Sequence, residues 1–410
     1  MRAGTLIPYT ATRGSRKTLT ESHPGATQPV GRAEDAVGSV EEADILQAAR
    51  RVADTALEPN AQESDRAGGP NPANFRALAE AGLLGLAVPR AYGGLGVSGA
   101  TQRAVTEILA AACGVTTFVQ AQHHGAAYQI GGAPNETLKQ ALLPDMAAGR
   151  RLCAVAIAHL RRPDPPVLRA EPVTGGYRLS GAAPWVTGWG LMNQVVIGAT
   201  LPDGRCVFVW SPARREEFAG LFADVAPPES GWGSLRASDP LPLCAMNASL
   251  TVTLTFDGWF VPQAHWLYEL DRETLQRNDR NGVLGPTALT LGCAAACVRL
   301  LCETAERRPL PAIRRAAATF ATEWETTRNL VLEWIGKTDA PDFFENALRL
   351  RAGCIELAVR AAHAAVAASS GAANTLTHPA QRLLREALFY TVQAQTVEVM
   401  DATLARLERP

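Results

Sequence analysis

The sequence predicts a multi-domain α+β protein with an N-terminal helical domain, a central antiparallel β-domain and a C-terminal four-helix bundle. Three regions of different periodicity predict this order. Apolar residues recur at helical steps of three and four in the first part of the chain, at every second position in the middle, and at helical steps again to the end. The 410 residues and their 47% hydrophobic content suffice for three domains with buried cores.

The N-terminal helical domain is expected at residues 43–150. Residues 1–42 are rich in Gly, Thr, Ser and Pro and have no apolar period, so we expect a disordered tail there. After a break of Gly, Pro and Asn residues, the pattern predicts a helix from Phe75 to Ala81 that ends at Gly82. Residues 100–149 are expected to add two or three further helices.

The middle β-domain is expected at residues 151–264. Ser249 to Phe256 alternates apolar and hydroxyl-bearing residues, which is the period of a half-buried antiparallel strand. From Leu267 onward the pattern is helical, and the four-helix bundle is expected at residues 265–410, because long Ala-, Leu- and Arg-rich segments are separated by short Pro- or Gly-containing turns. Further strands are predicted at Tyr177–Leu179, Val195–Thr200 and Val207–Trp210.

The charge composition argues against a nucleic-acid or membrane partner. Charged residues make up only 19% of the chain and the net charge is -1, whereas such partners require a clustered positive excess. Lysine occurs only at Lys17, Lys139 and Lys337, so nearly all positive charge is arginine. No uninterrupted apolar run approaches the roughly 18 residues that a membrane-spanning helix needs.

Cysteine usage and the N-terminus indicate a cytoplasmic protein without a metal site. Eight cysteines are too dilute for a disulfide scaffold, and none forms a Cys-x-x-Cys motif or a zinc-type Cys/His cluster. Cys293 and Cys297 are expected to be small core residues of one helix. The N-terminus carries basic residues but no continuous apolar segment, so a secretory signal is not expected.

Three motifs carry a resemblance to a known family. They are Gly82-Leu-Leu-Gly-Leu-Ala-Val-Pro-Arg-Ala-Tyr-Gly-Gly-Leu-Gly96, Leu179-Ser-Gly-Ala-Ala-Pro-Trp-Val-Thr-Gly188, and the pair Leu235–Asp239 with Thr255–Pro262. On these residues the chain resembles the acyl-CoA dehydrogenase superfamily over residues 43–405. The resemblance implies the same order of a helical domain, a β-domain and a four-helix bundle.

The resemblance also implies a cofactor and a partner. In that family the tryptophan and threonine of a Trp-x-Thr motif lie at the flavin ring of FAD, and they correspond here to Trp185 and Thr187. Arg307 corresponds to an arginine that reaches the FAD pyrophosphate across subunits, and Thr396 to a cofactor-contacting threonine. The substrate implied is an acyl thioester or a related acid, and the assembly implied is a homodimer or homotetramer.

The residue that the family uses as its base is missing. Arg385 to Thr396 aligns without gaps, and the position of the catalytic glutamate falls on Ala394. In some branches of the family the base lies on the first bundle helix, at a position that corresponds here to Gly282. Asp279, three residues earlier, is a weak candidate base, and the alternative is an acid stabilised at its helix by the helix dipole.

Other family positions have changed as well. The segment after Arg307 has prolines at positions 309 and 311, where the family has threonine and glycine. The first strand motif has become Ala158 to Asp164, which removes a hydroxyl and the serine that meets the thioester. His159 in this segment is a second weak catalytic candidate, since a histidine can exchange protons near neutral pH. His123 and His124 lie in the domain that lines the acyl pocket in that family, so the resemblance makes them candidates for a functional role. The alternative is that they form the polar end of a helix.

Three functions remain open from the sequence. The first is an FAD-dependent oxidoreductase that acts on a CH–CH bond of an acyl thioester, with no identifiable catalytic carboxylate. The second is a flavin-dependent monooxygenase or oxidase on the same fold, for which the loss of the carboxylate at position 394 matters less. The third is a flavin-poor, non-redox or accessory member of the family.

Overall fold

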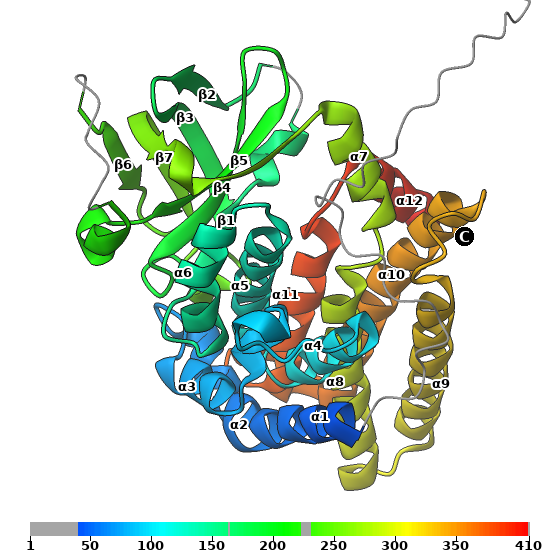
Figure 1. The fold of residues 1–410 in the computed structure, drawn as a ribbon. Helices are drawn as coiled ribbons and strands as arrows, with labels where there is room; N and C mark the ends of the chain where they lie inside the picture. Colours follow the sequence, from blue (N-terminus) through cyan, green and yellow to red (C-terminus); the bar gives the residue numbers. More distant parts are fainter. Residues whose placement is uncertain (1–39, 163–164, 223–230, 409–410) are drawn as a thin grey trace, which may run out of the picture.

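The computed structural model describes residues 40–162, 165–222 and 231–408. Helices come first, a sheet follows, and long helices complete the chain (Figure 1). The tail expected at residues 1–42 lies, as far as residue 39, outside the described residues. The helices are α1 (Val40–Val52), α2 (Glu58–Arg66), α3 (Pro72–Glu80), α4 (Gly99–Ala112), α5 (Gly114–Gly132), α6 (Glu136–Ala147), α7 (Arg272–Asn281), α8 (Thr287–Arg307), α9 (Pro311–Trp334), α10 (Phe343–Ser369), α11 (Pro379–Val392) and α12 (Val397–Leu407).

The central sheet is mixed, whereas the sequence predicted an antiparallel one. Its strand order is β6-β7-β3-β2-β4-β5-β8, and β1 runs parallel to β4 with Cys153 opposite Gln194. The alternating segment predicted at 249–256 contributes to β7, which pairs antiparallel with β3. The strands are β1 (Cys153–Ala156), β2 (Leu168–Val173), β3 (Gly176–Val186), β4 (Gln194–Thr200), β5 (Cys206–Pro212), β6 (Ser234–Ala237), β7 (Val252–Pro262) and β8 (Trp266–Leu270).

Strand β8 corrects the sequence-based expectation that helix begins at Leu267. Residues 266–270 pair with β5 as the last strand of the sheet, and α7 starts only at Arg272. The reason is long-range, because Leu267 and Leu270 are buried against the sheet, and the ladder with β5 supplies hydrogen bonds that local helix propensity does not offset. Asp271 then caps α7 by accepting a hydrogen bond from the Thr274 amide at 2.6 Å.

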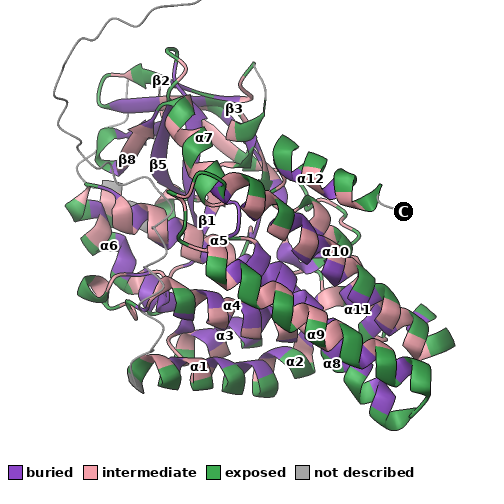
Figure 2. Ribbon diagram, turned by 90° about the vertical axis from the view of Figure 1, so that its right-hand side faces the viewer, coloured by how far each residue is buried: buried purple, intermediate pink, exposed green. Residues whose placement is uncertain are grey.

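The three parts share a continuous hydrophobic core. One cluster of buried side chains runs from Ile45 and Leu57 of the first helices through the sheet to Ala387 and Tyr390 of α11. Figure 2 shows the buried residues concentrated where the helices meet one another and where they meet the sheet. The parts therefore cannot separate without exposing apolar surface to water.

Helix α8 packs against helices of both the N-terminal and the C-terminal parts. By length and composition it is the one described helix that could cross a membrane, and the sequence had predicted no such segment. In the structure 72% of its apolar window is buried inside the protein, against α4, α9, α10 and α11. Such burial is typical of a core helix, and Cys293 and Cys297 on α8 are fully buried.

Candidate functional site

Trp185 stands out by its backbone and its exposure. It lies near the end of β3, beside a register shift between Ala183 and Val186 in the pairing with β7. Its φ is 65°, a left-handed value that a bulky residue rarely adopts, and 52% of the residue is exposed. Such a conformation costs on the order of 1–3 kcal/mol and is concentrated at functional sites. The register shift and the left-handed backbone together leave the Trp185 side chain exposed to solvent.

Thr187, two residues further on, faces the interior. It is 3% exposed, and its hydroxyl lies 2.9 Å from the Thr251 hydroxyl, which in turn lies 2.8 Å from the Ser249 hydroxyl. The Gly188 amide donates to the Ser249 carbonyl at 2.8 Å. These bonds fix the end of β3 against the start of β7, so the Thr187 hydroxyl is already engaged within the protein.

The loop between α11 and α12 contains Ala394, which the sequence resemblance places at the position of the family's base. Ala394 has a φ of 48°, so its backbone is held in the left-handed region by the surrounding structure. Thr396 caps α12, because its hydroxyl accepts a hydrogen bond from the Val399 amide at 3.3 Å. The loop therefore retains a defined backbone without offering a carboxylate at this position.

Arg307 lies at the C-terminal end of α8 and is exposed. Within the described ranges it has no ion-pair partner. Its neighbour Arg308 donates hydrogen bonds of 3.0 Å to the Ala368 carbonyl and the Ser370 hydroxyl, which ties the end of α8 to the end of α10. The break predicted near residues 309–311 lies between α8 and α9, and α9 starts at Pro311.

Asp279 is engaged in an ion pair. The Arg161 side chain binds it with two hydrogen bonds, from Nε at 2.8 Å and from Nη2 at 2.6 Å. Arg161 belongs to the short helix Ala158–Arg161 after β1, so the pair joins the β-domain to α7. Both carboxylate oxygens are occupied, and Asp279 would have to leave Arg161 before it could remove a proton from a ligand.

His159 is a buried structural residue. It is 4% exposed, and its Nε2 lies 2.8 Å from the Gly198 carbonyl, to which the neutral ring donates. Burial lowers the pKa of His159 to about 4, so the ring is neutral at physiological pH. This placement favours a role in anchoring the segment after β1 to β4 rather than in proton transfer.

His123 and His124 are engaged with the backbone of neighbouring segments. His123 Nε2 lies 3.2 Å from the Leu84 carbonyl, and its Nδ1 accepts from the Cys153 amide at 3.3 Å. His124 Nε2 lies 3.1 Å from the Leu83 carbonyl. Burial lowers the pKa of His123 to about 3 and that of His124 to about 4. His123 thus joins the N-terminal helices to the first strand.

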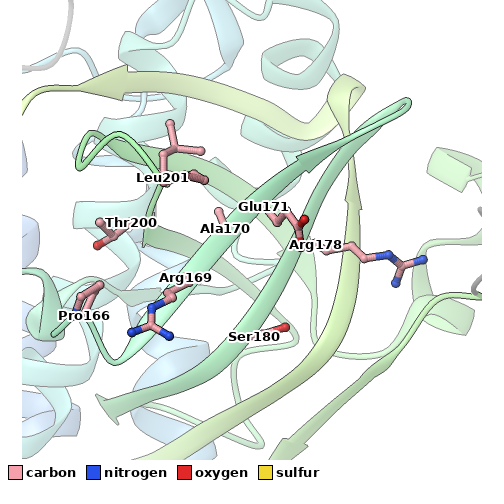
Figure 3. A pocket seen from close by; sticks show the side chains of 9 residues that line it. Pro166, Arg169, Ala170, Glu171, Arg178, Ser180, Thr200 and Leu201 are labelled. Carbon is pink, nitrogen blue, oxygen red and sulfur yellow. The ribbon is translucent and has the colours of Figure 1, made fainter.

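A shallow hollow lies elsewhere on the sheet. Side chains of β2, β3 and the end of β4 line it, among them Arg169, Glu171 and Arg178 (Figure 3). None of the residues that the sequence singled out as site residues lines it. In the part of the chain that the structure describes, no group of three or more His, Cys, Asp or Glu side chains is placed to hold a metal ion.

Two of the residues predicted for the cofactor expose side chains whose chemistry suits parts of FAD. The exposed indole of Trp185 suits stacking on an aromatic ring. The exposed guanidinium of Arg307 suits a phosphate. The four residues Trp185, Thr187, Arg307 and Thr396 make no hydrogen bond to one another among the described atoms, so no hydrogen-bond network joins them directly.

Sequence reasoning missed Arg351, which holds the α11–α12 loop. It lies on α10, is 3% exposed, and donates from Nη2 to the Gln393 carbonyl at 2.7 Å. The available signal was its position, because Arg351 falls four residues after Ala347 and four before Ile355, on the buried stripe of α10. A charged residue on an apolar stripe indicates a specific partner.

Comparison with known proteins agrees with this architecture. Residues 39–150 match the family model of the acyl-CoA dehydrogenase N-terminal domain, and residues 284–407 match that of the C-terminal domain. The probable acyl-CoA dehydrogenase YngJ of Bacillus subtilis is 23% identical over 85% of this chain and 93% of its own length.

Solved structures show the same fold. Butyryl-CoA dehydrogenase from Megasphaera elsdenii superimposes with a TM-score of 0.74 at 20% identity, covering 90% of this chain and 99% of its own. Dibenzothiophene monooxygenase from Paenibacillus gives 0.72 at 16% identity, covering 89% and 97%. The two family models together cover more than half of the chain. The chain therefore belongs to the acyl-CoA dehydrogenase family, as the sequence motifs had indicated, and is an oxidoreductase of that family.

Proposed function

We propose that this protein is an FAD-dependent oxidoreductase that acts on a CH–CH bond of an acyl thioester or a related acid. The observation that carries the proposal is Trp185, an exposed tryptophan with a strained backbone in the Trp-x-Thr motif of this family. Strain of this kind persists only where the surrounding structure holds it, and it is concentrated at ligand-binding sites.

The chain's own residues would act on the cofactor in separate ways. Trp185 offers a flat face for the flavin ring, and the buried bonds of Thr187 hold the strand end that carries it. Arg307 offers a positive charge for the pyrophosphate, and Thr396 orders the loop at the start of α12. When FAD is bound, its flavin ring supplies the acceptor for a hydride.

Removal of the substrate proton has no assigned base. Position 394 is alanine, position 282 is glycine, and Asp279 is bound by Arg161. This favours a second candidate, a flavin-dependent monooxygenase or oxidase, because chemistry between reduced flavin and oxygen does not require α-proton abstraction. Dibenzothiophene monooxygenase has the same fold as this chain, so the fold is compatible with both candidates.

The exposed apolar side chains of the last two helices support a homodimer or homotetramer. These residues are large and apolar, yet each lies outside the core, where a monomer would leave it in contact with water. They are Leu388, Val392, Val397, Met400, Leu404 and Leu407.

The visible spectrum of the purified full chain tests the proposal. We expect flavin absorption near one cofactor per chain, and Trp185→Leu should weaken FAD affinity at least about tenfold through the lost stacking face. Leu330→Ala, a change at an exposed residue of α9, is the matched control and should leave affinity unchanged. A colourless protein that takes up no added FAD would contradict both flavin-dependent functions and support the flavin-poor alternative.

Two further measurements separate the candidates once flavin is bound. Anaerobic bleaching of the flavin by a panel of acyl-CoA thioesters is expected for the dehydrogenase. Oxygen consumption that depends on a flavin reductant and an organic substrate, without bleaching by any thioester, would favour the monooxygenase or oxidase.

A glutamate at position 394 is not expected to create an efficient dehydrogenase. Ala394→Glu would restore the family's carboxylate, but the serine and hydroxyl of the first strand motif are still missing, and a base away from its productive geometry loses orders of magnitude in rate. We expect at most a few-fold change in acyl-CoA-dependent bleaching. Turnover near 10 s⁻¹, which is ordinary for enzymes, would contradict this prediction.

A further inference from the structure

Arg351 connects two segments that are far apart in the chain. Its Nη1 donates to the Val283 carbonyl at 2.9 Å, and its Nη2 donates to the carbonyls of Gln393 at 2.7 Å and Ala394 at 3.3 Å. Val283 lies in the turn between α7 and α8, next to Gly282. One guanidinium on α10 therefore holds the turn and the α11–α12 loop at the same time.

The surroundings of Arg351 are unusual for a buried charge. The residue is 3% exposed, and no carboxylate in the described ranges forms an ion pair with it. Burial lowers its pKa to about 10. The cost of burying this charge is offset by three backbone carbonyls, which a planar guanidinium reaches together and a lysine ammonium does not.

The two loop carbonyls that Arg351 binds flank the φ and ψ torsions of Ala394. The carbonyl of Gln393 precedes the φ torsion of Ala394, and the carbonyl of Ala394 follows its ψ torsion. Because Arg351 binds both, it restrains both torsions, and Ala394 keeps a φ of 48° that an alanine otherwise avoids.

We propose that Arg351 is a positioning residue that imposes the left-handed backbone of Ala394 and fixes the α7–α8 turn and the α11–α12 loop as one unit. It acts through the loop that carries Thr396, and it contacts neither substrate nor cofactor in this proposal. The inference goes beyond the proposed function and does not depend on bound FAD, because all of its contacts are within the chain.

Hydrogen exchange of the full chain, followed by mass spectrometry, tests the coupling of the two segments. In Arg351→Met, amide exchange should accelerate at least about tenfold in peptides covering 281–286 and 393–399 together, since both lose the same donor. Peptides covering β4 and β5 should not change. Arg349→Met, which removes an exposed arginine of the same helix paired with Glu345, should leave both segments unchanged.

A second measurement tests the imposed backbone. Ala394→Gly should shift the unfolding equilibrium of the natural protein toward the folded state about fivefold, because glycine adopts a positive φ without strain. In the Arg351→Met background the same change should give no gain, since Ala394 is then free to relax. If Arg351→Met does not fold, Arg351→Lys replaces it and should give intermediate exchange in both segments.

Several outcomes would overturn the proposal. Acceleration in only one segment, or equally throughout the helices, would show that Arg351 is merely structural. An equal effect of Ala394→Gly in both backgrounds would show that Arg351 does not impose the backbone. A failure of the cofactor proposal would appear as a colourless protein and would leave these exchange results unchanged.

Discussion

Replacing Arg382 with methionine is expected to destabilise the protein by about 3–5 kcal/mol. Arg382 and Glu386 form a 2.8 Å ion pair on α11, with side chains only 7% and 3% exposed. Burial raises the pKa of Glu386, although the charge of Arg382 opposes this effect. Without Arg382, Glu386 would remain as an uncompensated buried charge. Chemical denaturation with a two-state analysis measures the loss.

The ion pair joins α11 to the N-terminal helices. Arg382 Nε also donates to Gln62 of α2 at 2.8 Å, and a Cβ built on Gly114 at the start of α5 would lie 2.6 Å from the Glu386 carboxylate. The effect of Arg382→Met should therefore include weaker docking of α2 and α5.

Two variants control the Arg382 prediction. Arg349→Met removes an exposed i,i+4 ion pair with Glu345 on α10 and should cost no more than about 0.5 kcal/mol. The double variant Arg382→Met with Glu386→Leu leaves no unpaired charge and should recover at least half of the loss. If the double variant were as unstable as the single one, the unpaired carboxylate would not be the cause.

Acid is expected to destabilise the protein between about pH 6.5 and pH 4, because several buried or half-buried histidines are neutral in the folded state. The pKa of His123 is lowered to about 3, and those of His124, His159 and His265 are lowered to about 4, in each case by burial. As the pH falls below 6.5 the unfolded chain binds protons that the folded chain does not, so the free energy of unfolding decreases. Each such histidine contributes up to about 1.4 kcal/mol per pH unit.

The histidine contribution is measured from denaturation at several pH values. His124→Gln keeps an amide donor for the Leu83 carbonyl but cannot be protonated in this range, so the dependence on pH should become shallower by about one proton. Leu330→Ala, a change at an exposed residue of α9 that carries no titratable group, should leave the slope unchanged. A slope that is unaffected by His124→Gln would contradict the assignment.

The local motifs could group only those residues of the candidate site that lie close together in sequence, and their role at a cofactor stays a prediction. Trp185 and Thr187 are two residues apart at the end of β3. The structure leaves Trp185 exposed and buries Thr187. The candidates Asp279 and His159 could not be judged in this way, because their partners Arg161 and Gly198 are 118 and 39 residues away. Only the packed chain shows that the first is ion-paired and the second is buried.

The same limit applies to Arg351. Its hydrogen bonds reach backbone carbonyls 68 and 42 residues away, and a backbone carbonyl leaves no residue type for a sequence pattern to detect. The parallel pairing of β1 with β4 was missed for a similar reason, since alternation along a strand does not fix the direction of its neighbour.

By itself the sequence determined the order of helical domain, sheet and helices and indicated the family, whereas the loss of the family's carboxylate at position 394 stays a prediction. These depend on local periodicity and on residue types at short spacing, which a chain carries before it folds. The tertiary structure alone decided which charges are paired, which histidines are neutral and which backbone positions are strained. Those properties depend on burial and on contacts between distant segments, and they exist only once the three parts share one core.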